Sequence, residues 1–215
     1  MKIGRMIFNL FSENTFILWD DDLKEAAVVD PGMDCEEDVN KLKRFFAEND
    51  LTLKMILLTH QHVDHVLGVG WLVDEFGCKV YGHRDDVSWG EKVQIQADMF
   101  NLPCEVKNFK LTDYVEDGDV IKLNNEEIKV IHTPGHSKGG VVYYLPESGY
   151  ALVGDTIFER SIGRTDLSGG DFDTLLHSIR VKVLTLPSET VLHPGHGAST
   201  LVEEERECNP FLRKF

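Results

Sequence analysis

Hydrophobic and polar positions alternate along the first part of the chain. Residues 3–30 follow this pattern and run into an apolar stretch and a turn sequence, Ala26 to Gly32, which predicts short strands closed by a turn. Beyond them, apolar residues recur at helical spacing from Val39 to Phe46. Asp34 and Glu37 precede this stripe in the arrangement of a helix cap. The patterns predict strands followed by a capped helix.

Further patterns complete the first half of the chain. Leu53–Thr59 is an apolar run typical of a strand, and Lys79–Tyr81 is a shorter one. A helix is predicted over Val66–Phe76, where Gly77 ends the pattern. A second helix is predicted over residues 84–102.

The second half repeats this mixture. A capped amphipathic helix is predicted over Asp171–Leu184, and residues 201–207 predict one or two final helical turns. Strands are predicted at five places: Val120–Leu123, Glu127–His132, Val141–Leu145, Ala151–Gly154 and Thr190–Leu192. Strands and helices in both halves predict an α/β protein whose helices cover the faces of sheets. No linker or change of composition divides the chain, so residues 1–215 are expected to form a single domain.

Charge and composition exclude several classes of function. The net charge of −15 repels phosphate backbones and anionic lipid, so neither nucleic acid nor a membrane is expected as a partner. No apolar run approaches the roughly 20 residues of a membrane helix, and polar residues interrupt the N-terminal segment, unlike a signal peptide. The four cysteines are scattered, which predicts free thiols and a cytoplasmic location.

Side chains that bind metals gather where predicted strands end. His60, His62, Asp64 and His65 lie within six positions, directly after the apolar run that ends at Thr59. Three more candidates follow or close apolar runs farther along the chain: His136, Asp155 and His196. Such residues can converge on one edge of a sheet, where loops carry function. Imidazole together with carboxylate suits zinc, manganese or iron, so the set predicts a metal site.

This ligand pattern resembles that of the metallo-β-lactamase superfamily along essentially the whole chain: His60-x-His62-x-Asp64-His65, then His136, Asp155 and His196. The resemblance implies the four-layer αββα sandwich of that superfamily. Other stretches resemble its short glyoxalase II-like (hydroxyacylglutathione hydrolase) branch, and similar ones occur in its persulfide dioxygenases: Gly154-Asp155-Thr156, Ser161–Asp166, Glu205-Arg206 and Asn209-Pro210-Phe211.

The resemblance also implies how the ligands are shared. Two divalent ions are expected, zinc first and iron or manganese otherwise. One ion would be held by His60, His62 and His136. The other would be held by Asp64, His65 and His196, and Asp155 would bridge the two.

The same resemblance implies a mechanism and a substrate class. Two ions roughly 3.5–4 Å apart lower the pKa of a shared water, so that a bridging hydroxide can attack a carbonyl at neutral pH. Asp64 would both ligate and orient that hydroxide. A small-molecule thioester of the S-lactoylglutathione type fits because thiolate is a good leaving group. Arg164 is expected to contact the substrate, with pairing to Asp166 as the alternative role.

One departure concerns the end of the chain. Classical glyoxalase II continues into a helical C-terminal domain that supplies much of the glutathione pocket, whereas nineteen residues follow His196 here. That domain is not expected within residues 1–215, so the substrate can be a different thioester. The sequence indicates no oligomeric state.

The same residues are compatible with other functions to different degrees. A mononuclear iron persulfide dioxygenase would use His60, His136 and Asp155 as a 2-His-1-carboxylate site. A nucleic-acid phosphodiesterase is disfavoured by the charge, and a purely structural metal module by the number of ligands. A serine hydrolase would use Ser137 in a G-x-S-x-G motif, but that motif needs a helix immediately after the serine, where a strand is predicted.

Four further histidines are not expected to bind the metals. His132 and His193 precede proposed ligands by a few residues, which favours supporting or turn roles. His83 is expected to be structural and His177 to lie on a helix face.

Overall fold

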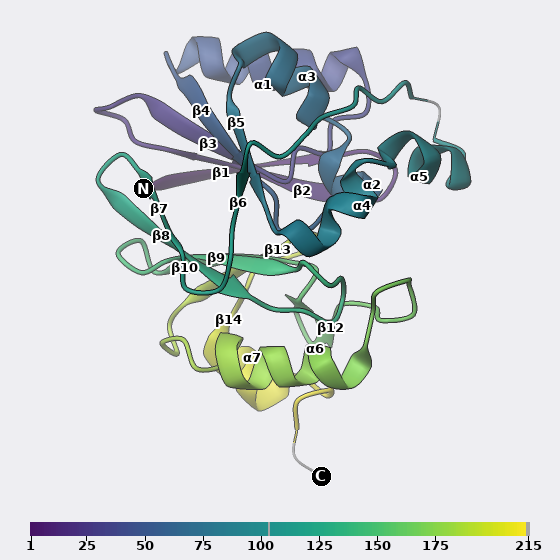
Figure 1. The fold of residues 1–215 in the computed structure, drawn as a ribbon. Helices are drawn as coiled ribbons and strands as arrows, with labels where there is room; N and C mark the ends of the chain where they lie inside the picture. The colour runs from purple at the N-terminus through teal and green to yellow at the C-terminus, as the bar shows by residue number, and fades with distance from the viewer. Residues whose placement is uncertain (103, 214–215) are drawn as a thin grey trace.

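Two β-sheets packed face to face form the centre of the molecule, and helices cover both outer faces (Figure 1). The computed structural model describes residues 1–102 and 104–213. The first sheet has the strand order β1 (Lys2–Phe8), β2 (Glu13–Trp19), β3 (Glu25–Val29), β4 (Thr52–Leu57), β5 (Lys79–Gly82) and β6 (Asp113–Tyr114). The second has the order β14 (Thr200–Leu201), β13 (Val191–Pro194), β10 (Tyr150–Gly154), β9 (Val141–Leu145), β8 (Glu126–His132) and β7 (Val120–Leu123).

The remaining elements lie around these sheets. A short hairpin joins β11 (Ile157–Phe158) to β12 (Ser161–Ile162). The helices of the first half are α1 (Glu36–Glu48), α2 (Val63–Val66), α3 (Val69–Phe76), η1 (Arg84–Asp86), α4 (Val87–Gly90) and α5 (Val93–Met99). Those of the second half are α6 (Phe172–Ser178), the π-helical segment η2 (Ile179–Val183) and α7 (Val202–Cys208). This arrangement confirms the expected four-layer αββα sandwich.

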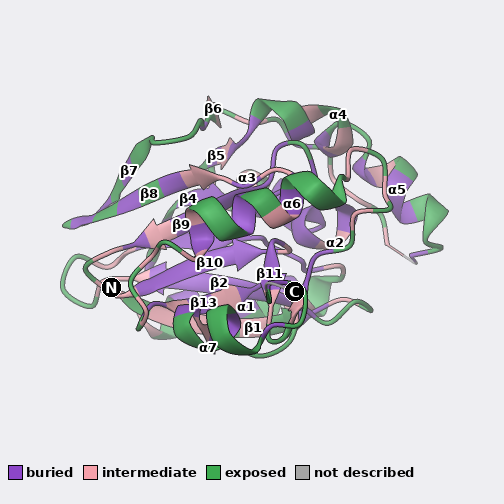
Figure 2. Ribbon diagram, turned by 90° about the horizontal axis from the view of Figure 1, so that it is seen from below, coloured by how far each residue is buried: buried purple, intermediate pink, exposed green. Residues whose placement is uncertain are grey.

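The apolar core forms three layers because successive side chains of a strand point to opposite faces of its sheet. Val28 packs toward α1 and α3, whereas Val29 packs between the two sheets. In β9, Tyr143 lies between the sheets and Val142 lies under α6. The buried strands in the middle and the exposed outer turns of α6 are visible in Figure 2. Across residues 1–102 and 104–213, no helix is long and apolar enough to cross a membrane.

The topology brings the C-terminal ends of several strands to one edge of the sandwich. In the first sheet, β3 and β4 are parallel. In the second sheet, β10 and β13 are parallel, and β8 has the same direction because β9 runs antiparallel to both β8 and β10. The loops that follow β4, β8, β10 and β13 therefore meet at this edge.

Most predicted elements are confirmed, but two expectations are wrong. The N-cap of α1 is Cys35, and no side chain caps the helix, so Asp34 and Glu37 do not form the expected cap. Acidic residues still occupy the first turn, where their negative charge interacts favourably with the positive end of the helix dipole.

The expected helix over residues 84–102 is divided into η1, α4 and α5. The division follows Gly90, which lies so close to the Gln61 side chain and the Phe109 ring that a β-carbon there would clash. The side-chain amide of Gln96 donates to the Trp89 carbonyl at 2.9 Å, so this carbonyl has a hydrogen-bond partner at the break. Packing against the loop after β4 thus overrides the local helical pattern.

The helix over Asp171–Leu184 is confirmed, and Asp171 caps it by accepting the Thr174 amide at 2.8 Å. Its last turn widens, with Leu184 N bonded to Ile179 O. The Asp171 amide also donates to the Gly135 carbonyl at 2.8 Å, which ties α6 to the loop before His136.

Removing the side chain that α6 buries under this loop should destabilise the fold. Leu175 is fully buried and packs against Gly135, so we expect Leu175→Ala to lower the free energy of unfolding by about 2–5 kcal/mol. Phe172→Ala on the same helix is the matched control, because Phe172 is 46% exposed. Urea denaturation measures both, and equal losses for the two variants would contradict this packing.

Candidate metal centre

The structure brings all seven predicted ligand residues to the same edge. They come from four segments: the loop after β4 with the first turns of α2, the β8–β9 loop, the residue after β10 and the loop after β13. They are His60, His62, Asp64, His65, His136, Asp155 and His196. All but Asp64, Asp155 and His196 are buried, and these three are partly exposed toward a cavity.

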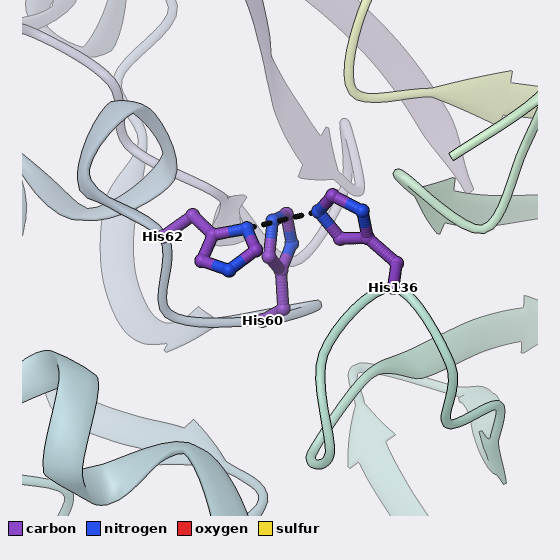
Figure 3. A group of neighbouring side chains, drawn as sticks. All are labelled: His60, His62 and His136. Carbon is purple, nitrogen blue, oxygen red and sulfur yellow. Dashed lines mark hydrogen bonds between the residues drawn. The ribbon is translucent and has the colours of Figure 1, made fainter. Parts of the chain in front are cut away.

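A first set consists of three histidines whose ring nitrogens all lie within 4.8 Å of one another: His60, His62 and His136. Figure 3 shows their rings facing each other from two separate segments of the chain. His62 Nδ1 and His136 Nε2 are 2.9 Å apart. His136 Nδ1 must donate to the Arg164 carbonyl 2.8 Å away, because a carbonyl only accepts. Nε2 is therefore the ring nitrogen of His136 that faces this set.

A second set lies beside the first and consists of Asp64, His65 and His196. His196 Nε2 is 3.1 Å from Asp64 Oδ2, and His65 Nε2 is 3.5 Å from the same oxygen. His196 Nδ1 donates to the Phe11 carbonyl at 3.0 Å, which again leaves Nε2 facing the set.

The Asp155 carboxylate spans the two sets. Its Oδ1 lies 3.5 Å from His65 Nε2 in the second set. Its Oδ2 lies 3.6 Å from His136 Nε2 in the first set and 3.7 Å from His196 Nε2 in the second. A carboxylate in this position can bind a cation on either side.

The chemistry of the donors fits divalent cations. Buried polar atoms without a hydrogen-bond partner among the described residues include His60 Nε2, His65 Nε2 and Asp155 Oδ1. Leaving such an atom unsatisfied costs about 1–3 kcal/mol. Cations bound at the two sets would satisfy all three atoms, and imidazole with carboxylate is a donor set for zinc, iron or manganese.

Burial and charge set different protonation states for the histidines. Burial, with neighbouring histidines adding to it, lowers the pKa of His60 well below its usual value and that of His62 to about 3. These two imidazoles are neutral at pH 7, as metal ligands must be. Burial acts in the same sense on His65, but the Asp64 and Asp155 carboxylates outweigh it and raise its pKa. A cation at the second set would replace that proton.

Asp30 supports the site and was missed by the sequence analysis, which placed it in a turn. It directly follows β3 and accepts three hydrogen bonds: from Thr59 N at 2.7 Å, from Thr59 Oγ1, and from His65 Nδ1 at 3.0 Å. Thr59 Oγ1 lies 3.2 Å from His60 Nδ1, so the network orients two histidines. The available signal was an acidic residue that directly follows the apolar run Ala26–Val29.

A cavity of about 310 Å³ opens over the two sets. Its wall is largely apolar, and no motif in the sequence indicated the residues that form it: Phe11, Trp89, Met99, Phe100 and Leu167. Phe11 and Phe100 meet edge to face at 5.5 Å, and Trp89 packs against the His62 ring at 5.6 Å. The wall shields one side of the metal centre from water.

Arg164 also lines this cavity, but its guanidinium is engaged. Nε and Nη2 donate to the two oxygens of Asp166 at 2.7 Å each. The alternative role, pairing with Asp166, is therefore the one seen in the structure. A substrate contact by Arg164 stays a prediction.

The structure also decides the readings of two other motifs. Ser137 is buried and donates to Asp86 Oδ2 at 2.7 Å, and β9 rather than a helix follows it, so the serine-nucleophile geometry is absent here. The rings of His83 and His132 stack at 4.2 Å and are nearly parallel, so their in-plane lone pairs do not converge on a common ion.

Weakening the Asp30 network should weaken metal binding. Asp30 has a φ of 49°, which asparagine tolerates, so Asp30→Asn keeps the backbone and removes the charge. We expect metal affinity to fall by about 10- to 100-fold, as for other residues that orient ligands. Competition with a chromophoric chelator measures it, with Asp22→Asn, in an exposed turn, as the control. An unchanged affinity in Asp30→Asn would contradict the role assigned to Asp30.

Comparisons with known proteins agree with this geometry. Residues 9–196 match the family model described as the metallo-beta-lactamase superfamily. The chain is 37% identical to hydroxyacylglutathione hydrolase GloC of Haemophilus influenzae, covering 99% of this chain and 98% of the relative. Among solved structures it is similar to BLEG-1 B3 metallo-beta-lactamase, with a TM-score of 0.89, 34% identity and coverage of 99% and 100%.

A second solved structure, of TTHA1623 in a di-iron-bound form, gives a TM-score of 0.86 and 33% identity, with coverage of 97% and 100%. The family model and the relatives span nearly the whole chain, including both donor sets. This chain belongs to the metallo-beta-lactamase superfamily, whose members bind divalent metals.

Proposed function

We propose that this protein is a dinuclear metallohydrolase that cleaves a thioester of the S-lactoylglutathione type. The observation that carries the proposal is the pair of donor sets that share Asp155 at the base of a cavity. The name of the Haemophilus influenzae relative, a hydroxyacylglutathione hydrolase, supports the substrate class. The di-iron form of a structure with 33% identity supports two ions rather than one.

The residues divide as the geometry suggests. His60, His62 and His136 would hold one ion, Asp64, His65 and His196 the other, and Asp155 both. Divalent ions there would supply Lewis acidity, which lowers the pKa of water and polarises a carbonyl. Zinc is the first candidate, with iron and manganese as the others.

The chain itself supplies orientation and an enclosed site. Burial raises the pKa of Asp64, but His65 and His196 outweigh it and lower the pKa, so the carboxylate is ionised at neutral pH. An Asp64 oxygen that faces the cavity can accept a hydrogen bond from a water molecule and fix its direction of attack. The thiol that leaves has a pKa near 8.5, so no acidic side chain is required to protonate it.

Metal removal tests the reaction class. S-D-lactoylglutathione should be hydrolysed by metal-reconstituted protein, and the loss of thioester absorbance should stop with a chelator and resume when zinc, iron or manganese is returned. Asp155→Asn should lower kcat/KM by at least about a hundredfold, because both donor sets lose a charged ligand. Asp98→Asn, exposed on α5, is the matched control.

Two outcomes would overturn the proposal. If fully metallated protein hydrolyses no thioester, ester or β-lactam, hydrolase activity is excluded. Oxygen uptake with glutathione persulfide by a protein holding one iron would favour the dioxygenase, since that reaction needs only His60, His136 and Asp155.

A further inference from the structure

A second cavity adjoins the one above the metal centre. It has a volume of about 270 Å³, and Trp89 lines both cavities. Residues that are close in sequence also line the two cavities. His136 and Leu167 line the first cavity, and Lys138 and Ser168 line the second. A molecule that reaches the metal centre can therefore extend past Trp89 into this second cavity.

Two lysines give this cavity a charge that the rest of the site lacks. Lys92 and Lys138 line it, and within residues 1–102 and 104–213 neither has a carboxylate within 4.0 Å. Arg164, the cation of the neighbouring cavity, is already paired with Asp166. In a chain with a net charge of −15, two unpaired ammonium groups beside the metal centre form a local site for an anion.

The backbone that carries Lys138 is held firmly. Asp86 accepts the Ser137 hydroxyl at 2.7 Å and the Gly139 amide at 2.8 Å. The Lys138 carbonyl accepts a hydrogen bond from His132 Nε2 at 2.9 Å. Only the end of the lysine side chain is thus left free to move, which reduces the entropy lost when it binds a ligand.

Lys92 lies at the turn between α4 and α5. The backbone N–H of Lys92 donates to the Trp89 carbonyl at 2.9 Å. The Lys92 carbonyl accepts from the backbone N–H of Gln96, also at 2.9 Å. Lys92 therefore lies in the short connection between the two helices, where it lines the second cavity together with Trp89.

The cavity also has an acidic side. Asp85 lines it together with Ser88, and the Asp85 carboxylate is 52% exposed. Lysines suit a carboxylate, whereas aspartate suits an ammonium group. The combination matches an amino-acid end group, in which a carboxylate and an ammonium lie on the same carbon.

We propose that the cavity lined by Lys92, Lys138 and Asp85 binds a zwitterionic amino-acid end of the thiol half of the substrate, while the acyl half lies at the metal centre. This inference rests on the proposed thioester hydrolysis and deepens it. In glutathione the middle residue carries the thiol, so the amino-acid end can lie about 7 Å, the length of two extended residues, from the sulfur.

Three thioesters of the same acyl group test the proposal: lactoyl-glutathione, neutral lactoyl-N-acetylcysteamine and lactoyl-coenzyme A. In Lys92→Ala and Lys138→Ala, the ratio of kcat/KM for the glutathione thioester to that for the neutral thioester should fall roughly two- to fivefold, mainly through KM, because both lysines are exposed. Asp85→Asn should lower kcat/KM for the glutathione thioester more than for the coenzyme A thioester. Lys122→Ala, an exposed lysine of β7, is the charge-matched control and should change no ratio.

Calorimetric titration with S-methylglutathione gives a readout that needs no turnover. Its Kd on the metal-reconstituted protein should rise by a similar factor in both lysine variants and remain unchanged in Lys122→Ala. An unchanged ratio and Kd in Lys92→Ala and Lys138→Ala would overturn the proposal. So would lysine variants that affect only the coenzyme A thioester, since phosphate would then be the ligand.

The two proposals fail in distinguishable ways. If wild-type protein hydrolyses the neutral thioester but prefers it to the glutathione thioester, the hydrolase stands and this cavity assignment falls. If none of the three thioesters is hydrolysed, the proposed function falls, and the S-methylglutathione titration alone decides the cavity.

Discussion

The central strands of this protein are buried on both faces, and this constraint determines where its chemistry can lie. Every residue of β10 is buried, and β3 and β9 are nearly as apolar. A charged side chain on either face of such a strand would lose its hydration without gaining a partner. The candidate ligands accordingly lie in the segments that follow the strands, and the parallel course of β3 with β4 and of β10 with β13 brings those segments to one edge.

The same edge can hold so many polar groups because each has a fixed orientation. Carbonyl groups at Phe11 and Arg164 determine which nitrogen of His196 and of His136 carries the proton. Asp30 does the same for His65. Close packing also restricts the backbone: a β-carbon at position 195 would lie 2.5 Å from both Asp155 Oδ1 and His65 Cε1, so only glycine fits beside the two donor sets.

What the sequence predicts well is governed by local pattern. Apolar runs revealed most of the strands, and ligand residues at the ends of those runs indicated the edge at which they meet. The break at Gly90 could not be predicted in this way, because it depends on Gln61 and Phe109, which are remote in sequence. Nor could the cavity wall: Phe11 comes from the first hairpin and Phe100 from the end of α5, and only the fold makes them neighbours. Arg164 is the opposite case. Its partner Asp166 lies only two residues away, so the local sequence was enough to indicate that the two side chains could pair.

The first hairpin is bonded to the last ligand loop. The backbone N–H of Asn14 donates to the Gly195 carbonyl at 2.7 Å, and the Asn14 side chain donates to the carbonyls of Pro194 and Gly197. Glu13 also forms an isolated antiparallel β-bridge with His196. About 180 residues separate these partners. Contacts between such remote segments require closure of nearly the whole chain, so the second donor set is complete only when both ends of the chain have folded together. An ion that binds only the completed set would stabilise the native state in proportion to RT ln(1 + [M]/Kd). The lifetime of the folded chain would then depend on the metal supply around it, independently of any substrate it meets.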